Sequence, residues 1–346
     1  MLNRKFKIIM FLVLTLILSV SLLTFAADNE TYTIKLAYVA PELTYYQSKD
    51  TCYAQTFKPY VESESQGRIK VEIYPAGQLG GERELLESLT LGTIEMVDVS
   101  DAVISGFYKK AMVTDTPGVF SSIEEANAVF AGPWGQAWNE ELRKALGVKV
   151  LNHDCGGFRN FSNNIRELRV PDDVRGLKIR VMESPVYVNM VNSLGAIATP
   201  MPASEMYAAM QHGVVDGQEN PIANVIDMKV YEVQKYYTLD CHTAESGVWL
   251  INDDFFNSLP EDLQKVVLKG ANRAGQAKLG LIYVLEGVGL EFLSKYMQIY
   301  APTPEEAELW RNAITSTTHN WVREQIGDEI LDGLLDAIKD YREQNK

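Results

Sequence analysis

The chain has 346 residues, with 46 acidic residues against 32 Lys and Arg, so its formal net charge at pH 7 is −14. Its hydrophobic fraction of 46% is ordinary for a globular protein. The acidic excess argues against a nucleic-acid partner, because no basic stripe is present to neutralise phosphates.

The first 26 residues predict a secretory signal peptide. Three Lys and Arg residues precede an uncharged apolar run at 8–23, and small residues follow at 24–27. We expect cleavage after Ala26, with Ala27 as the alternative position. The apolar run is short for a bilayer span, so an uncleaved membrane anchor is the weaker interpretation.

Strands alternate with helices in the first part of the mature chain. Alternating polar and apolar residues predict strands at 33–39, 69–74 and 94–99. Helical spacing predicts helices at about 45–64 and 82–91. This alternation indicates an α/β fold.

The middle of the chain predicts a crossing between two domains. A capping box at Ser122 starts an expected helix to about Leu146, and a short buried strand follows at 148–151. The Gly156-Gly157 pair after this strand is a natural place for the chain to pass from one domain to the other.

The second half contains further strands, a possible second crossing and a very long helix. The expected elements are a strand at 177–181, a helix at 204–212, an extended stretch at 236–251, and helices at about 258–296, from 303, and at 326–342. We therefore expect two interleaved α/β domains, one made of 27–156 plus 246–285 and the other of 157–245 plus 286–346.

Neither the cysteines nor the histidines predict a metal site. Cys52, Cys155 and Cys241 are widely spaced, and the four histidines lack the spacing of metal ligands. A Cys155–Cys241 disulfide is conceivable, but three buried free thiols are the favoured interpretation. We expect no metal and no cofactor.

Catalytic motifs are missing from the sequence. There is no GxSxG, HExxH, P-loop, GxGxxG or CxxC string. His153 and Cys155 could share one side of a strand and form a dyad, but this is a weak signal. Neighbouring acids such as Asp98 and Asp101 are more typical of helix caps and solvated faces. We expect no enzymatic activity.

Several strings resemble one family of binding proteins. They are GLKIRV at 176–181, LGA at 194–196, TPMP at 199–202, SEMYAAMQ at 204–211 and VVDGQENP at 214–221, with GQLG at 77–80 and LPEDL at 259–263. The chain resembles the DctP-type solute-binding proteins of TRAP (tripartite ATP-independent periplasmic) transporters, in order over nearly its whole mature length.

The resemblance implies a periplasmic-binding-protein-like fold and a transport function. Two α/β domains would enclose a ligand cleft, connected by hinge strands and spanned by a long helix. The protein would be a periplasmic monomer that captures a small organic acid and delivers it to TRAP membrane subunits. A sugar acid such as a uronate is favoured, and a C4-dicarboxylate or a sulfonate stays open. A receptor for a sensor system, or a secreted enzyme on a similar frame, is the alternative.

The resemblance also implies roles for three residues. Arg180 would bind the ligand carboxylate with both arms of its guanidinium, Arg159 would be a second cation, and Asn220 would form a hydrogen bond. Residue chemistry agrees for Arg180, because an arginine fork matches a carboxylate and an idle cation inside an apolar strand is costly. The alternatives are internal salt bridges for both arginines and a plain turn for Asn220.

The remaining candidates follow from position in the family. Tyr45, Glu82, Ser100 and Asp101 would face the cleft. One position departs from the family pattern, because Ala203 stands where many members have an aromatic residue. The pocket is then larger there, or another ring fills it, and the candidate rings are Phe158, Tyr187 and Trp249.

Overall fold

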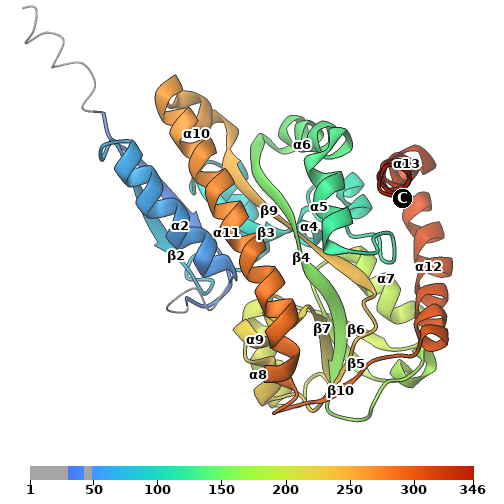
Figure 1. Cartoon of the computed structure of the whole chain (residues 1–346). Coiled ribbons are helices and arrows are strands. Elements are labelled where there is room, and N and C mark those ends of the chain that lie inside the picture. Colours follow the sequence, from blue (N-terminus) through green and yellow to red (C-terminus); the bar gives the residue numbers. More distant parts are fainter. Residues whose placement is uncertain (1–29, 43–48) are drawn as a thin grey trace, which may run out of the picture.

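The computed structural model describes residues 30–42 and 49–346 (Figure 1). The expected signal peptide and Tyr45 both lie outside the described residues. Within the described ranges, we find no helix with the length and apolarity needed to cross a membrane.

Strands and helices alternate along the chain. The strands are β1 (Tyr32–Ala37), β2 (Ile69–Tyr74), β3 (Met96–Ser100), β4 (Val148–Asn163), β5 (Lys178–Val181), β6 (Ile197–Pro200), β7 (Gly217–Asn220), β8 (Tyr236–Thr238), β9 (Thr243–Asn252) and β10 (Gln298–Tyr300). The α-helices are α2 (Lys49–Glu64), α3 (Glu82–Thr90), α4 (Asp101–Ile104), α5 (Ile123–Ala131), α6 (Pro133–Leu146), α7 (Pro185–Ser193), α8 (Ala203–Gln211), α9 (Ile222–Asp227), α10 (Asp253–Ser258), α11 (Glu261–Leu293), α12 (Pro304–Ile326) and α13 (Asp328–Gln344). Short 3-10 helices are η1 (Lys109–Val113), η2 (Pro171–Val174) and η3 (Val230–Glu232).

The sheet is mixed, and β4 and β9 form its centre. The strand order is β2-β1-β3-β9-β4-β7-β5-β6, with β8 paired to β4 and β10 paired to β8. The first part of β4 pairs antiparallel with β9, and its last residues pair with β7 and β8. One continuous strand of 16 residues therefore belongs to both halves of the sheet.

Helix α11 runs alongside this central pair and touches both halves of the molecule (Figure 1). It packs against α2, then β4, then α9. A Cβ atom added at Gly275 would lie 2.7 Å from Asn152, and one at Gly289 would lie 2.5 Å from Ile222. Glycine at both positions therefore lets the helix approach β4 and α9 closely.

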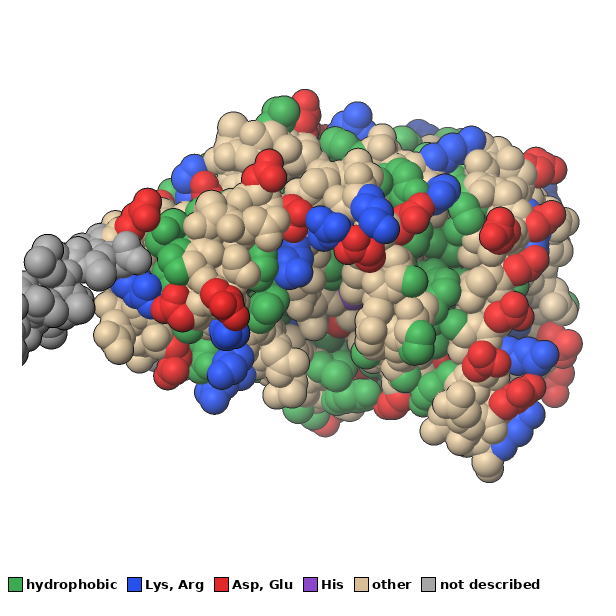
Figure 2. Space-filling model, turned by 90° about the horizontal axis from the view of Figure 1, so that it is seen from above, with side chains coloured by type: hydrophobic (Ala, Val, Ile, Leu, Met, Phe, Trp, Pro, Cys, Tyr) green, Lys and Arg blue, Asp and Glu red, His purple; other side chains and the backbone are tan. Residues whose placement is uncertain are grey.

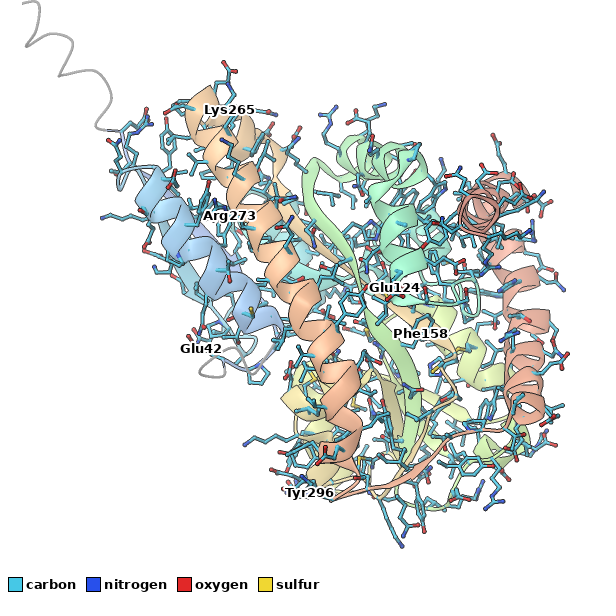
Figure 3. All side chains as sticks on the ribbon, in the orientation of Figure 1. Glu42, Glu124, Phe158, Lys265, Arg273 and Tyr296 are labelled. Carbon is cyan, nitrogen blue, oxygen red and sulfur yellow. The ribbon has the colours of Figure 1, made fainter. Side chains whose placement is uncertain are left out.

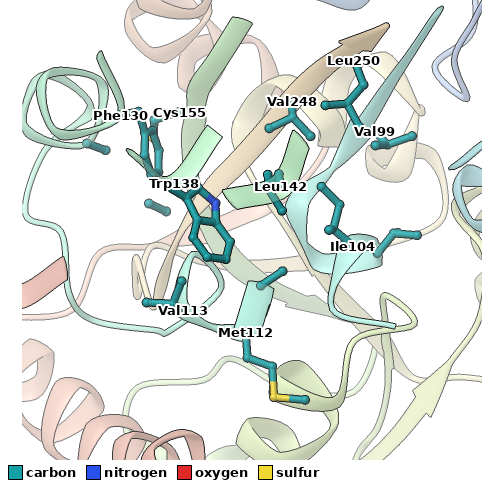
Figure 4. Close-up of a cluster of buried hydrophobic side chains, with 14 of the residues drawn as sticks. Val99, Ile104, Met112, Val113, Phe130, Trp138, Leu142, Cys155, Val248 and Leu250 are labelled. Atoms are coloured by element: carbon teal, nitrogen blue, oxygen red, sulfur yellow. The ribbon is translucent and has the colours of Figure 1, made fainter. Parts of the chain in front are cut away.

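The buried apolar residues form separate clusters in the two halves. Figure 4 shows the largest, in which α5 and α6 pack against β3, β4 and β9 around Trp138 and Leu142. A second cluster joins α2 and α11 to β1 and β2. Two further clusters surround Trp310 and Tyr237 in the other half. Each half thus has apolar cores of its own.

The α/β class, the long helix and most of the expected strands are confirmed, and several local predictions were wrong, among them the single extended stretch at 236–251, which is divided into β8 and β9. The helix expected from Ser122 to Leu146 is divided into α5 and α6, because Pro133 lacks the N–H needed to continue a helix. The short strand at 148–151 continues through the glycine pair to Asn163. The sequence interpretation also missed α7 and β6.

The domain boundaries stay a prediction. The C-terminal helices contact both halves, because α12 packs on α7 while α13 packs on α5 and α6. The three cysteines are free thiols, and Cys52 and Cys155 are buried as expected. Cys241 is exposed, so the expectation that all three would be buried was wrong.

Candidate functional site

A cavity lies where strands from both halves of the sheet end. Its lining follows the carboxyl ends of β1, β3, β5 and β7, where ligands bind in open α/β sheets. The empty volume is about 640 Å³, including the part open to solvent. The lining residues are Tyr38, Val39, Ala40, Asp50, Glu82, Asp98, Val99, Ser100, Arg180, Met182, Ala203, Asn220, Asn224, Asp227, Met228, Glu245, Gly247 and Lys278.

Arg180 lines this cavity from β5 and forms no salt bridge with any described residue. Its Nε and one terminal nitrogen donate to the Met201 carbonyl oxygen at 3.1 and 2.7 Å. Burial lowers the pKa of the guanidinium to about 10, since Arg180 is only 2% exposed. A buried cation that forms no salt bridge has the chemistry to hold an anion.

Asn220 lines the cavity from the end of β7, the strand that pairs with β5, which carries Arg180. Its amide oxygen accepts a hydrogen bond of 3.2 Å from Asn224, and its amide nitrogen donates to Gln218. The Tyr237 hydroxyl donates to the Asn220 carbonyl oxygen at 3.0 Å. The side chain is therefore oriented by neighbours and is not part of a plain surface turn.

Glu82 and Ser100 line the opposite wall. The Ser100 N–H donates to a Glu82 carboxylate oxygen at 3.0 Å. Burial raises the pKa of Glu82 to about 7, and Glu245 adds to the rise despite this hydrogen bond. Both residues were expected at the cleft from sequence.

Lys278 reaches the cavity from the middle of α11, where three aspartates surround it. Its ammonium nitrogen lies 3.7, 3.6 and 3.3 Å from carboxylate oxygens of Asp50, Asp98 and Asp154. Burial alone would lower the pKa of Lys278, but the three carboxylates raise it above its ordinary value. The positive charge of Lys278 is thus already compensated.

Arg159 is not brought to the cavity. Its guanidinium is fully buried and forms salt bridges with Glu219 and Glu245. The Tyr187 ring lies 5.2 Å from the guanidinium carbon, so both predicted residues belong to this buried cluster. Glu245 connects it to the cavity, because Glu245 also lines the cavity wall.

Asp101 lies behind the cavity wall. It pairs with His153 Nε2 at 2.8 Å and accepts a hydrogen bond from the Ser246 hydroxyl. Burial would raise the pKa of Asp101, but His153 and these hydrogen bonds hold it below its usual value. Phe158 lines a different cavity.

None of the proposed rings fills the space next to Ala203. Tyr187 faces Arg159, Phe158 lies elsewhere, and Trp249 packs against Tyr53 with ring centres 3.6 Å apart. Ala203 itself lines the cavity, so the wall stays open at this position.

The described part of the chain holds no group of three or more His, Cys, Asp or Glu placed to bind a metal ion.

Comparison with known proteins identifies the family. The family described as "Bacterial extracellular solute-binding protein, family 7" (DctP) matches residues 43–325. The chain belongs to this family.

Other proteins resemble this chain in sequence and in fold. A solute-binding protein of Verminephrobacter eiseniae is 37% identical over 64% of this chain and 66% of that protein. The C4-dicarboxylate-binding periplasmic protein DctP of Rhodobacter capsulatus is 33% identical over 80% of this chain and 84% of its own. The sugar acid binding protein DctPAm of Advenella mimigardefordensis, solved with galactonate, is 30% identical with a TM-score of 0.85, covering 90% of this chain and 99% of that one.

The sequence did not predict several residues that line the cavity containing Arg180. Lys278 could have been found, because a single lysine stands in an otherwise apolar stretch of the long helix. Glu245 and Asp98 lie within predicted strands, but nothing in the local sequence tells which face they take. Tyr38 lies in the cavity lining because strand β1 ends one residue before it, and the sequence does not show where that strand ends.

Proposed function

We propose that this protein binds a small organic acid in the cavity at the strand ends and delivers it to the membrane subunits of a TRAP transporter. The observation that carries this proposal is that Arg180 offers a buried guanidinium that forms no salt bridge with any described residue. Membership of the extracellular solute-binding family supports the transport role.

The charges of the cavity favour a hydroxylated monocarboxylate, such as a sugar acid or uronate. Arg180 can hold one carboxylate group. Glu82, Asp98 and Glu245 also line the cavity, and the charge of Lys278 is compensated by its aspartates. A second carboxylate on the ligand would meet these acids, whereas hydroxyl groups can donate hydrogen bonds to them. Relatives of both kinds are known, one binding a C4-dicarboxylate and one solved with galactonate, so the preference rests on the charges of this cavity.

The remaining parts of the proposal concern location and activity. We expect a periplasmic protein, cleaved after Ala26, that acts as a monomer without a metal. Ser246, His153 and Asp101 lie together, but both partners contact the same nitrogen of His153, at 2.8 Å for Asp101 and 2.9 Å for Ser246. A hydrolase triad needs them on opposite ring nitrogens, so this arrangement argues against a hydrolase of that type.

The ligand class is tested by a thermal-shift screen on the mature protein. Galactonate, glucuronate, succinate and a small sulfonate would be compared at equal concentrations. A ligand at 100 times its Kd stabilises the folded state by roughly 2.7 kcal/mol. We expect the hydroxylated monocarboxylates to raise the melting temperature most, and a larger shift with succinate would overturn the proposed class.

The role of Arg180 is tested by titration calorimetry with the best ligand of that screen. Removing one partner of a buried charge pair costs about 2–5 kcal/mol, so Arg180→Ala should weaken binding by roughly 30-fold to several-thousand-fold. Arg180→Lys should also bind poorly, because it keeps the charge and loses the fork. A Kd within about threefold of the wild-type value for Arg180→Ala would remove Arg180 from the site.

A further inference from the structure

A second cavity lies on the side of β4 that faces α12 and the C-terminus. Its empty volume is about 1160 Å³, including the part open to solvent, compared with about 640 Å³ for the first cavity. Figure 3 labels Phe158 on this side of the strand, in the direction of α7 and α12. The walls come from residues 118–121, Phe158, 239–242, 307–315 and Arg342.

The inner surface of this second cavity is apolar. Phe120 and Ile314 are 7% and 1% exposed, and Phe158 and Leu239 are half-buried beside them. Such an interior suits a compact hydrocarbon group, whose burial contributes about 25 cal/mol per Å² of apolar surface.

The rim of the second cavity is positively charged, on a chain whose net charge is −14. Arg311 is exposed and its guanidinium has no hydrogen bond or salt bridge to any residue in the described ranges. Arg342 is held by Glu125, with a distance of 2.5 Å from its Nε. His242 contacts two carboxylates, Asp240 at 2.6 Å and Glu219 at 3.3 Å, so it offers no uncompensated positive charge. Arg311 is therefore the charge available to a ligand.

The walls are connected by hydrogen bonds, so the cavity does not depend on a ligand to form. The Gly118 N–H donates to the His242 carbonyl oxygen at 2.9 Å, which joins two distant segments of the lining. The Leu239 N–H donates to the Tyr300 carbonyl oxygen at 2.8 Å, and Arg342 donates to the Val119 carbonyl oxygen at 3.1 Å. A preformed site binds with a smaller loss of conformational entropy.

We propose that this second cavity is a binding site for an amphipathic monocarboxylate, with its apolar body against Phe120, Phe158 and Ile314 and its carboxylate at Arg311. The site is separate from the cavity that contains Arg180, since the two share no lining residue. The proposal does not depend on the ligand of the first cavity.

The test is titration calorimetry with octanoate and its neutral analogue octanamide on the full mature protein. We expect saturable binding of octanoate and clearly weaker binding of octanamide. Arg311→Glu should weaken octanoate binding by at least about tenfold through charge reversal. Ala307→Phe should also weaken binding, because the larger side chain takes up part of the apolar space from the half-buried face of α12 and leaves every charge in place.

Two variants serve as controls. Lys269→Glu makes the same charge change at an exposed position of α11 outside the cavity, and Arg180→Ala disables the first cavity; both should bind octanoate like the wild type. Circular dichroism would verify that all variants fold. Absence of saturable octanoate binding at millimolar concentration, or binding that survives both Arg311→Glu and Ala307→Phe, would overturn the proposal. Loss of octanoate binding in Arg180→Ala alone would assign it to the first cavity.

Discussion

Arg159 and Arg180 are both almost completely buried, at 0% and 2% exposure, but their surroundings differ. Arg159 is surrounded by carboxylates, which raise its pKa above the ordinary value even though burial alone would lower it. Arg180 donates to a backbone carbonyl, and burial lowers its pKa to about 10. The first arginine therefore stabilises the fold, and the second is available to a ligand.

Replacing Arg159 should destabilise the protein more than it weakens binding. Arg159→Ala leaves Glu219 and Glu245 without their shared cation, and breaking a buried pair costs about 3–5 kcal/mol. Urea unfolding followed by circular dichroism gives the free energy of unfolding. Arg175→Ala is the control, because Arg175 forms an exposed pair with Asp172 at 3.2 Å, and such pairs contribute about 0–1 kcal/mol. Equal losses in the two variants would contradict the structural role.

Glu82 should make anion binding depend on pH. Burial raises its pKa to about 7, and a bound carboxylate in the same cavity raises it further, so binding takes up a proton. Two like charges about 5 Å apart repel by roughly 3 kcal/mol at an effective dielectric of about 20. A hydrogen bond from a ligand hydroxyl to ionised Glu82 offsets about 1.5–3 kcal/mol of this repulsion, which at most cancels it. Affinity should therefore fall as pH rises from 6 to 8.

Calorimetric titrations at pH 6, 7 and 8, each in two buffers of different ionisation enthalpy, measure both the affinity and the proton uptake. Glu82→Gln is the matched variant, because it keeps the size and shape of the side chain and cannot ionise. Its affinity should vary much less over this range. An affinity that rises with pH in the wild type would show that the ionised form of Glu82 is the binding form.

At the scale of elements, the glycine pair in β4 forms a bulge at the centre of the molecule. The register with β9 shifts between Cys155 and Phe158, so Gly156 and Gly157 oppose a single residue, Glu245. Gly157 has a φ of +112°, which residues with a side chain rarely adopt. The bulge therefore re-aims the strand where it leaves one half of the sheet and enters the other.

Alanine substitutions at two glycines should have opposite effects on stability. In Gly157→Ala, the new Cβ would lie 2.9 Å from Glu286 Oε1 in a strained backbone conformation, which should cost about 1–3 kcal/mol. In Gly287→Ala, on the open face of α11, the Cβ meets no atom within 4 Å, and alanine should stabilise the helix by about 0.5–1 kcal/mol. Thermal unfolding of both variants measures this, and a stabilised Gly157→Ala would argue against strain at the bulge.

Periodicity in the sequence predicted the elements that have one buried face, and it could not predict long-range pairing. Helix α11 was visible because its pattern is long and regular, and the strands β1 and β2 because they alternate. Strand β4 was not visible as one strand, since the glycine pair in its middle is typical of a loop. Arg180 and Arg159 were both identified through the family resemblance, and the apolar strand around Arg180 agreed with its expected role. The sequence left an internal salt bridge open for both arginines, and the contact with Glu219 shows that Arg159 forms one.

At the scale of the whole molecule, the acidic surface opposes the binding of an anion. Red and blue side chains are interspersed on the face shown in Figure 2, without one large area of a single sign. The chain nevertheless has a net charge of −14, so long-range attraction cannot concentrate an organic acid. We therefore expect the local guanidinium of Arg180, in a cavity whose walls come from both halves of the sheet, to supply the affinity.

This arrangement predicts that the ligand draws the two halves together. Without it, no salt bridge connects Arg180 on one wall to Glu82 on the other, whereas a hydroxylated carboxylate can bind both walls at once. Small-angle X-ray scattering should give a smaller radius of gyration when the best ligand of the thermal-shift screen is added. Arg180→Ala should show no compaction at the same ligand concentration, because the carboxylate end is no longer held. If the wild-type radius of gyration stays constant at saturating ligand, binding occurs in a rigid cavity, and recognition then depends on the side chains of a preformed site alone.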